Sequence, residues 1–326
     1  MASLAPASVV TTTSSLTHLA TIWYDKVAVE NLKANLPYQA ATERRVLPER
    51  NGKTIQMFGY QVLGANTNPG SEGQPGTGIA PTTATNKTSV LQYFDYMSFS
   101  DLLIETAIDP IVENSAGEMG YRAALTVNSL TSSAFEAANT SATEIDLVDN
   151  EFFTASIARQ AVMSLRGQNA KPKADGMFYG IIHPFVSYDL LNDNTAGGVI
   201  DILKHVQSGV NELTKGVQGY RVIELSGVRY IETTTVPTYA NFPSSGKTGY
   251  ATYVIGKDAI FSVSLGATAV PNENNFRLIT RNWEPSASDP AGVVGASVAY
   301  NFKYAVLARP NAVPTFRRVR SEASIS

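Results

Sequence analysis

Small and apolar residues recur in steps of three and four along residues 109–139. Positions with this spacing stack on one face of a helix, so the pattern predicts one long amphipathic helix. Asp109 can cap the first turn, and Pro110 suits that turn because its missing N–H would have no partner there. We therefore expect the helix to begin at Asp109. The recurring positions are Val112, Ala116, Met119, Ala123, Val127, Leu130 and Ala134.

The opposite face of this helix is predicted to be polar. Glu118 and Arg122 lie four residues apart, which places them side by side on the solvent face. At ~1.5 Å per residue the helix would reach roughly 45 Å, which is long for a domain of this size. The rest of the chain is expected to be organised around it.

Two runs rich in β-branched and aromatic residues, 52–63 and 89–97, predict strands, and we expect them to pair as one hairpin. Residues 64–88 between them are rich in Gly and Pro and predict a long loop. A lone hairpin is marginal in water and could not bury its own aromatic side chains, so we expect another copy of the chain to cover them. These aromatics are Phe58, Tyr60, Tyr93 and Phe94.

The remaining pattern mixes helices and strands, as an α+β protein would. Helices are expected at 22–36, 153–166, 184–193 and 199–213, with Gly167 as a left-handed stop for the second. Strands are expected at 177–182, 221–225, 228–234, 250–255, 259–265, 276–282 and 297–308, with a tight turn at Ser226 and Gly227. The end of the chain, with Arg317, Arg318 and Arg320, is expected to be a solvated basic tail.

Composition favours a globular, non-exported protein. The 326 residues are 44% hydrophobic and can bury a substantial core, in one large or two intertwined domains. A net charge of -3 gives no general attraction to nucleic acid, and the absence of Cys excludes disulfides and thiolate sites. No Lys or Arg precedes Lys26, so the basic start of a secretory signal is missing, and no apolar run is long enough to cross a bilayer.

Catalytic motifs are not found. The three histidines, His18, His183 and His205, have no partners at metal-binding spacing, and a structural role is favoured for them. Gly246, Lys247 and Thr248 echo a phosphate-binding loop, but Asn241 stands where that motif needs glycine. We expect no enzymatic activity and no catalytic, cofactor or metal site.

Several separated segments resemble the major capsid proteins of tailed bacteriophages, in the branch typified by the coat protein of phage N-four. The most specific match is residues 100–111, which include Thr-Ala-Ile-Asp-Pro-Ile, followed by the helix at 113–122. Residues 51–55, 180–184 and 289–292 match in the same order. The resemblance covers the chain from about Tyr24 to Ala308.

The resemblance implies an α+β protein of the Hong Kong ninety-seven-type capsid fold. Its expected parts are an N-terminal arm (1–46), an extended β-hairpin loop (47–97), a peripheral domain with a long spine helix (98–149), an axial domain (150–248), long peripheral strands (249–308) and a C-terminal tail (309–326).

The implied function is a structural one: self-assembly into the icosahedral head that encloses the genome in the virion. The implied partners are copies of the chain itself in hexamers and pentamers, a portal, a separate scaffolding protein, and packaged double-stranded DNA held by loose, non-specific contact. The resemblance also allows a decoration protein as a further partner. Contacts between subunits are expected at Phe58, Tyr60, Pro69, Gly70, Pro75, Tyr93, Phe94, Glu118 and Arg122.

Two other hypotheses stay in view. An encapsulin-type shell has the same fold but encloses enzyme cargo. A polysaccharide-acting enzyme or adhesin could also show long Gly/Pro loops, but it would need a carboxylate pair or an aromatic sugar-binding groove. Only two tryptophans, Trp23 and Trp283, are available for such a groove.

Overall fold

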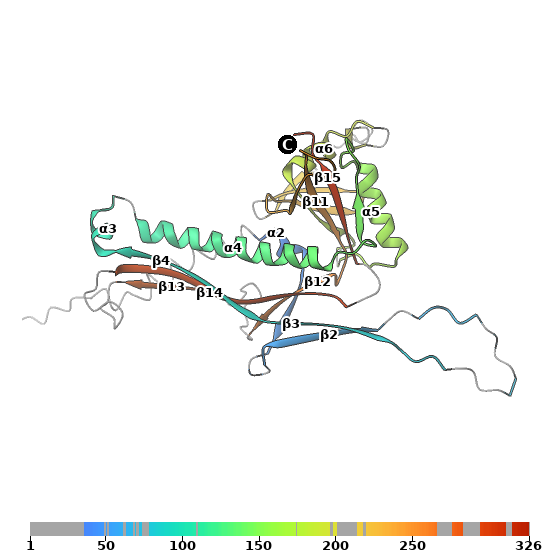
Figure 1. The fold of residues 1–326 in the computed structure, drawn as a ribbon, viewed down its shortest axis with the longest axis horizontal. Coiled ribbons are helices and arrows are strands. Elements are labelled where there is room, and N and C mark those ends of the chain that lie inside the picture. Colours follow the sequence, from blue (N-terminus) through green and yellow to red (C-terminus); the bar gives the residue numbers. More distant parts are fainter. Residues whose placement is uncertain are drawn as a thin grey trace, which may run out of the picture. The chain divides into compact units, whose positions relative to one another are not determined.

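The computed structural model describes residues 36–48, 50, 52–60, 63–67, 69, 72–73, 78–108, 110–173, 175–195, 198–200, 214–217, 220–265, 276–282, 294–310 and 315–325. Its helices are α2 (Pro37–Ala41), α3 (Asp101–Thr106), α4 (Ile111–Ala138), α5 (Ala155–Gly167) and α6 (Pro184–Leu191) (Figure 1). Its strands are β1 (Glu43–Leu47), β2 (Thr54–Tyr60), β3 (Thr83–Ser89), β4 (Leu91–Ser100), β5 (Glu144–Asp146), β6 (Phe178–Ile182), β7 (Thr214–Val217), β8 (Tyr220–Leu225), β9 (Val228–Glu232), β10 (Thr238–Ala240), β11 (Thr248–Ile255), β12 (Ile260–Leu265), β13 (Arg277–Asn282), β14 (Val294–Ala308) and β15 (Phe316–Glu322). The helices expected at 22–36 and 199–213 fall almost entirely outside the described residues.

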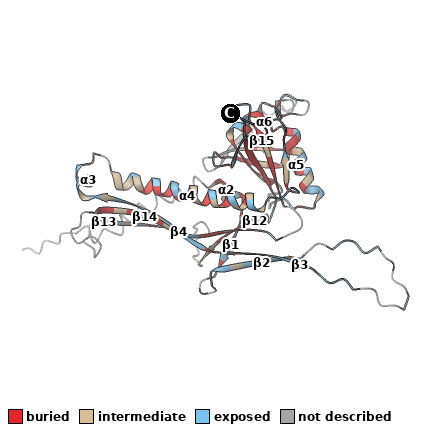
Figure 2. Cartoon of the chain, viewed as in Figure 1, coloured by how far each residue is buried: buried red, intermediate tan, exposed pale blue. Residues whose placement is uncertain are grey.

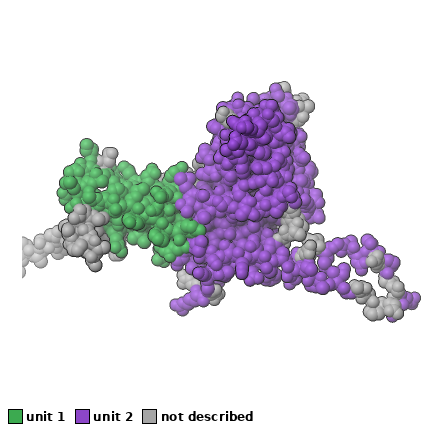
Figure 3. All heavy atoms as spheres, in the orientation of Figure 1, with its two compact units in different colours: residues 1–35, 92–124, 275–302 green, residues 36–91, 125–274, 303–326 purple. Residues whose placement is uncertain are grey.

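The chain forms two compact units (Figure 3). The smaller unit comprises residues 1–35, 92–124 and 275–302, and the larger unit comprises residues 36–91, 125–274 and 303–326. Helix α4 and strand β14 run from one unit into the other. The five-stranded sheet that contains β14 has the order β1-β12-β14-β13, and β4 also pairs with β14.

An eight-stranded sheet forms the centre of the larger unit, with the order β5-β15-β11-β6-β9-β8-β7 and with β10 beside β11. Strands β11 and β15 are buried along almost their whole length (Figure 2). Strands that are covered on both faces carry near-continuous apolar runs, as β6 and β11 do. The strands predicted at 177–182 and 250–255 are therefore confirmed.

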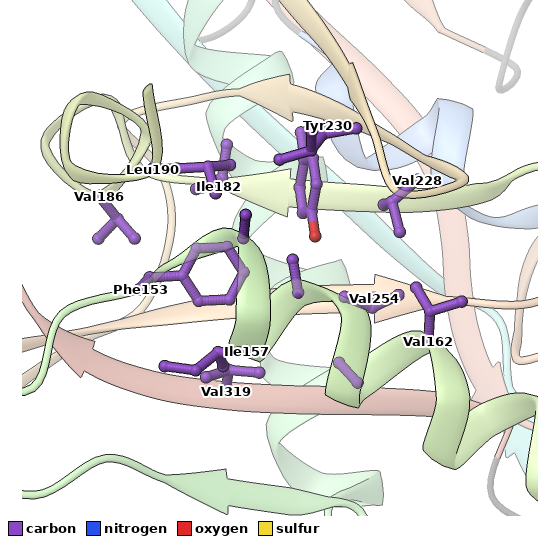
Figure 4. Packing of buried hydrophobic residues seen from close by; sticks show 14 of the residues in the cluster. Phe153, Ile157, Val162, Ile182, Val186, Leu190, Val228, Tyr230, Val254 and Val319 are labelled. Carbon is purple, nitrogen blue, oxygen red and sulfur yellow. The ribbon is translucent and has the colours of Figure 1, made fainter. Parts of the chain in front are cut away.

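Helix α5 packs on one face of this sheet. Figure 4 shows side chains of α5 and of the segment before it directed at those of β6, β9, β11 and β15. The helix turns its predicted apolar face to the strands, as its 3.6-residue period requires. The central contacts are made by Phe153, Ile157, Val162, Ile182, Val228, Tyr230, Val254 and Val319.

Aromatic packing on Phe135 holds the last turns of α4 in the larger unit. The Phe135 ring lies 6.3 Å from that of Tyr38, 5.1 Å from that of Tyr253 and 5.6 Å from that of Phe316, measured between ring centroids. Phe135 is fully buried. Such tilted and edge-to-face pairs add to the hydrophobic gain of burial, so α4 is fixed here by a specific cluster.

The predicted long helix is confirmed, although it begins at Ile111 and Asp109 lies outside the described residues. Ala116, Met119, Ala123 and Val127 are buried, whereas Glu118 and Arg122 are exposed. The three- and four-residue spacing therefore marks the packed face correctly. Val112, Leu130 and Ala134 are half-buried.

The prediction of a solvated basic tail is wrong. Residues 316–322 form β15 between β11 and β5, and Arg317 and Arg318 are buried. Arg318 forms ion pairs with Glu136 of α4 and Glu144 of β5, and Arg320 donates from Nε to Asp146 Oδ1 at 2.7 Å. The hydrogen bond from Arg320 holds the pKa of Asp146 below its usual value. Carboxylates compensate the buried charge of Arg318, whereas Arg317 donates to the Ser164 hydroxyl at 2.8 Å and to the Ala142 carbonyl.

Two turn predictions have different outcomes. The tight turn between β8 and β9 is confirmed, because Ser226 and Gly227 have φ angles of 56° and 80°. Gly167 is not the left-handed stop of α5. Asn169, with a φ of 58°, adopts that conformation two residues later, and Asn tolerates it through its short polar side chain.

Helix α5 receives its N-terminal cap from the end of another helix. Thr154, at the N-cap position, makes no side-chain cap bond, and the Ala155 N–H instead donates to Asp193 Oδ2 at 3.0 Å. Asp193 Oδ1 accepts from the Thr195 hydroxyl at 2.6 Å. Burial raises the pKa of Asp193, but these hydrogen bonds outweigh it and leave the pKa lower than usual.

We expect Ala123→Leu to destabilise the chain by about 1–3 kcal/mol, because added methylenes in a packed site force neighbouring atoms apart. Ala123 is fully buried. Ala137→Leu is the matched control, since Ala137 is exposed on the same helix and should tolerate the change. Urea unfolding of both variants checks this, and equal stability of the two would contradict the assignment of the packed face.

We expect Asp193→Asn to lower the free energy of unfolding by about 1 kcal/mol at neutral pH. A carboxyl with a depressed folded-state pKa contributes stability above its ordinary pKa of about 4 and loses it as the pH falls through the lower folded-state value. The difference between the parent chain and the variant should therefore shrink as the pH falls from about 5 to 3. Urea unfolding across this range measures it, with Glu118→Gln as an exposed-carboxylate control. A pH-independent difference would be inconsistent with this role.

Candidate assembly surface

The hairpin is real, but its second strand was predicted wrongly. β2 pairs antiparallel with β3, with Thr54 opposite Ser89 and Tyr60 opposite Thr83, and the predicted partner at 89–97 is β4, which pairs with β14. β3 has the sequence TATNKTS, which carries no large apolar side chain. β3 forms a strand because Thr, a β-branched residue, favours extended backbone, and because β2 supplies the hydrogen-bonding partner for its backbone. The aromatic run at 91–97 was the stronger but misleading signal.

The hairpin exposes its aromatic side chains. Phe58 and Tyr60 are 66% and 65% exposed, and their rings meet edge to face with centroids 6.2 Å apart. In the described part of the chain, β2 and β3 form a sheet of their own, so no further strand covers them (Figure 2). The hairpin is held at its base, where Val90 is buried and its N–H donates to Lys53 O at 2.8 Å.

Only one of the three predicted contact residues in the hairpin loop is among the residues that the structure describes. Pro69 is exposed, and its contact with a neighbouring copy stays a prediction. Gly70 and Pro75, the other two predicted contact residues of the loop, lie outside the described residues.

Tyr93 and Phe94, which were predicted to lie together on the hairpin, belong to β4 and point to opposite faces. Tyr93 stacks on Phe302 with ring centroids 5.5 Å apart, and burial raises the pKa of its hydroxyl. Phe94 is 70% exposed, and its neighbour on the same face, Tyr96, is 67% exposed. Alternate residues of a strand face opposite sides, so only the Phe94 side of β4 offers a free aromatic surface.

A groove of about 400 Å³ lies on this exposed face of the smaller unit. Its walls come from β4, β13 and β14 and include Phe94, Tyr96, Ile279, Arg281 and Ala299. Sequence reasoning missed Tyr96, Ile279 and Arg281. The signal that could have found them is the alternation at 277, 279 and 281, which predicts one strand face with two cations and an apolar side chain.

Glu118 and Arg122 lie on the exposed side of α4 in the smaller unit. Arg122 Nη2 is 2.6 Å from Asp95 Oδ2, which ties the helix to β4 within the same chain. An exposed pair of this kind contributes at most about 1 kcal/mol. A contact of Glu118 and Arg122 with a neighbouring subunit stays a prediction.

The described residues include no group of three or more His, Asp or Glu side chains placed to hold a metal ion. His183 caps α6, since its Nδ1 accepts from the Phe185 N–H at 3.2 Å while its ring stacks on Tyr250. Burial lowers the pKa of His183 and favours the neutral form that can accept this bond. His18 and His205 lie outside the described residues. None of the described helices is both long and apolar enough to span a membrane.

Comparison with known proteins identifies the fold. No protein-family model and no curated protein sequence matches the chain. The capsid of Ralstonia phage GP4 matches with a TM-score of 0.65 and 9% identity, over 89% of this chain and 92% of that chain. The cyanophage Pam1 capsid matches with a TM-score of 0.63 and 12% identity, over 91% and 93%.

The holo-SrpI encapsulin complex of Synechococcus elongatus matches less well, with a TM-score of 0.54 and 9% identity, over 88% of each chain. The chain therefore has the α+β fold of phage capsid proteins, the Hong Kong ninety-seven-type fold that its sequence resembles. At these identities the likeness shows the fold.

Proposed function

We propose that this chain is a major capsid protein that self-assembles into the icosahedral head of a tailed double-stranded DNA bacteriophage and encloses the genome. The observation that carries this proposal is a hairpin with two exposed aromatic side chains on a chain that has a capsid fold. Exposed apolar surface of this kind marks an interaction site. The role is structural and non-catalytic, and the protein resides in the virion after assembly in the host bacterial cytoplasm.

In this proposal the parts of the chain take the roles known for the fold. Residues 1–46 form the N-terminal arm, 47–97 the extended loop, 98–149 the spine helix region, 150–248 the axial domain, 249–308 the long peripheral strands and 309–326 the C-terminal segment. Two of these bounds need correction, because β4 pairs with β14 and not with the hairpin, and β11 lies in the eight-stranded sheet with β6 and β15. The burial of β15 supports a C-terminal segment that belongs to the axial sheet.

Neighbouring copies in hexamers and pentamers cover the exposed aromatic side chains. Phe58, Tyr60 and Pro69 of the hairpin, with Gly70 and Pro75 at its tip, meet one neighbour, and Phe94 with Glu118 and Arg122 meets another. Tyr93 supports this surface from beneath, through its stacking on Phe302. Closed symmetry limits the growth of such an assembly.

Other partners follow from the proposed role. A portal and a separate scaffolding protein take part in assembly, and a decoration protein stays open. The packaged DNA makes loose, non-specific contact, which fits a chain with a net charge of -3.

An encapsulin-type shell that encloses enzyme cargo is the second candidate, because an encapsulin shares the fold. Its TM-score of 0.54 is lower than the 0.65 of the phage GP4 capsid, which favours the phage role. The contents of the particle distinguish the two.

Electron microscopy of particles from cells that produce the protein tests the proposal. We expect closed icosahedral shells, and virions carrying this chain should protect double-stranded DNA from nuclease. A packaged enzyme in place of DNA would establish the encapsulin role instead. A chain that remains monomeric even with scaffolding protein supplied would refute both.

We expect the double variant Phe58→Ser with Tyr60→Ser to fold normally but to lose shell assembly. The two side chains are exposed in the isolated chain, so their removal should change the free energy of unfolding by only about 0.5 kcal/mol. In an interface, loss of aromatic anchors costs roughly 2 kcal/mol or more each. Met163→Ser, a change at an exposed apolar residue of α5, is the control and should assemble normally. Sedimentation velocity measures assembly, and normal shells from the double variant would contradict the role of the hairpin.

A further inference from the structure

Helix α3 and the residues that follow it form an apolar projection of the smaller unit, here called the α3 knob (residues 101–108). Leu102 is 68% exposed, Leu103 is 44% exposed and Ile108 is fully exposed. Nothing in the described part of the unit covers these side chains. An exposed cluster of this kind is unfavourable in water unless a partner covers it.

The start of the knob has a defined structure. The Ser100 hydroxyl accepts from the Leu103 N–H at 3.3 Å and caps α3. The first residue of α3 presses on β14, because a Cβ at Gly295 would lie only 2.6 Å from the Asp101 Cα. The beginning of the knob is therefore seated on the sheet, which reduces the entropy that a partner would have to remove on binding.

The knob is acidic. No Lys or Arg occurs between Lys87 and Arg122. Glu105 is exposed on α3 and makes no hydrogen bond or ion pair with any residue that the structure describes. The knob thus presents leucine and isoleucine side chains beside an unpaired carboxylate.

The groove on β4, β13 and β14 is lined by one cation, Arg281, and by Asp95, whose carboxylate is already paired with Arg122 of α4. Its apolar walls are Phe94, Tyr96 and Ile279, and Arg281 stands at its β13 side. Arg277 lies on the same face two positions before Ile279, because side chains of a strand alternate. Arg277 and Arg281 are exposed and form no ion pair within the described ranges.

We propose that the α3 knob of one copy binds in this groove of a second copy, with Glu105 facing Arg281. Leucine and isoleucine side chains would meet an aromatic surface, and the Glu105 carboxylate would meet guanidinium groups that form no ion pair with the residues that the structure describes. Burial of the apolar side chains of the knob would supply most of the affinity, and the pairing of Glu105 with Arg281 would fix the position of the knob in the groove. The inference rests on the proposed function, since it names one of the contacts through which copies assemble.

The contact is heterologous, because knob and groove are different patches of the same chain. Each copy offers one of each, so the contact repeats from subunit to subunit, as a ring or shell requires. An isologous dimer would instead use the same patch twice.

The hairpin is the competing occupant of the groove, and its charges fit less well. Strands β2 and β3 carry Lys87 and no acidic residue. The hairpin strands therefore offer nothing to pair with Arg277 and Arg281, and the described carboxylate of the loop between them is Glu72, which has no large apolar side chain beside it. The knob offers Glu105 together with Leu102 and Leu103.

Charge reversal tests the pairing. Glu105→Lys and Arg281→Glu should each raise the protein concentration needed for half-maximal assembly by about three- to tenfold, because each places like charges together. The combined variant reverses the pair and should return to within about twofold of the parent chain. Sedimentation velocity of the full chain, with scaffolding protein where assembly needs it, gives the concentration, and circular dichroism confirms folding.

Glu105→Lys combined with Lys257→Glu is the matched control. It restores the same net charge through an exposed lysine of the larger unit, so it should remain impaired. Rescue by this control as well would overturn the inference, as would single variants that assemble normally. An effect of Arg281→Glu without an effect of Glu105→Lys would assign the groove to another segment, such as the hairpin. A parent chain that never assembles would overturn the proposed function and this contact with it.

Discussion

A sheet has two faces, and in the smaller unit the residues that the structure describes cover only one of them. Val298, Tyr300 and Phe302 of β14 are buried, as are Met119 and Ala123 of α4, which runs beside the strands (Figure 1). The other face leaves the rings of Phe94 and Tyr96 of β4 in water. Since burial of apolar area is the main favourable contribution to folding and association, this uncovered face is an incomplete core that a second molecule can complete.

The larger unit, by contrast, satisfies most of its groups internally. Glu136 accepts hydrogen bonds from Tyr239 and Tyr253 and forms an ion pair with Arg318, and burial raises the pKa of both tyrosine hydroxyls, so they remain donors. Removing one partner of such a network leaves a buried charge unpaired, which is far more costly than the loss of a surface pair. The sheet of the larger unit is therefore held by internal contacts around Glu136, and the most exposed aromatic rings lie on the hairpin and on β4.

The sequence predicted those elements whose packing follows a local period. The spacing from Ala116 to Val127 identified α4, and continuous apolar runs identified β6 and β11. Six of the described strands were not predicted, namely β1, β3, β5, β7, β10 and β15. Two of them show different physical reasons. β3 is polar because most of its side chains, on both faces, are exposed, and β15 carries arginines with distant partners, such as Glu136, which lies 182 residues from Arg318 in the chain. The groove was missed because it joins β4 to strands nearly 200 residues later, and no local pattern reports such a pairing.

The fold is shared with capsid structures at about 10% identity, so the pattern of buried positions, and not particular residues, specifies it. The proposed assembly surfaces depend on particular residues, because in the proposal affinity comes from exposed aromatic rings and register from a few charges such as Glu105 and Arg281. A subunit of the proposed shell contacts several neighbours at once. Once one contact has formed, the others form within the same complex, where the effective concentration of the partner surfaces is high. Each contact can then be weak by itself. In the proposed assembly, weak contacts whose register is set by charge pairs dissociate readily when a subunit is misplaced. Misplaced subunits can then rebind correctly, and this favours closed shells over irregular aggregates.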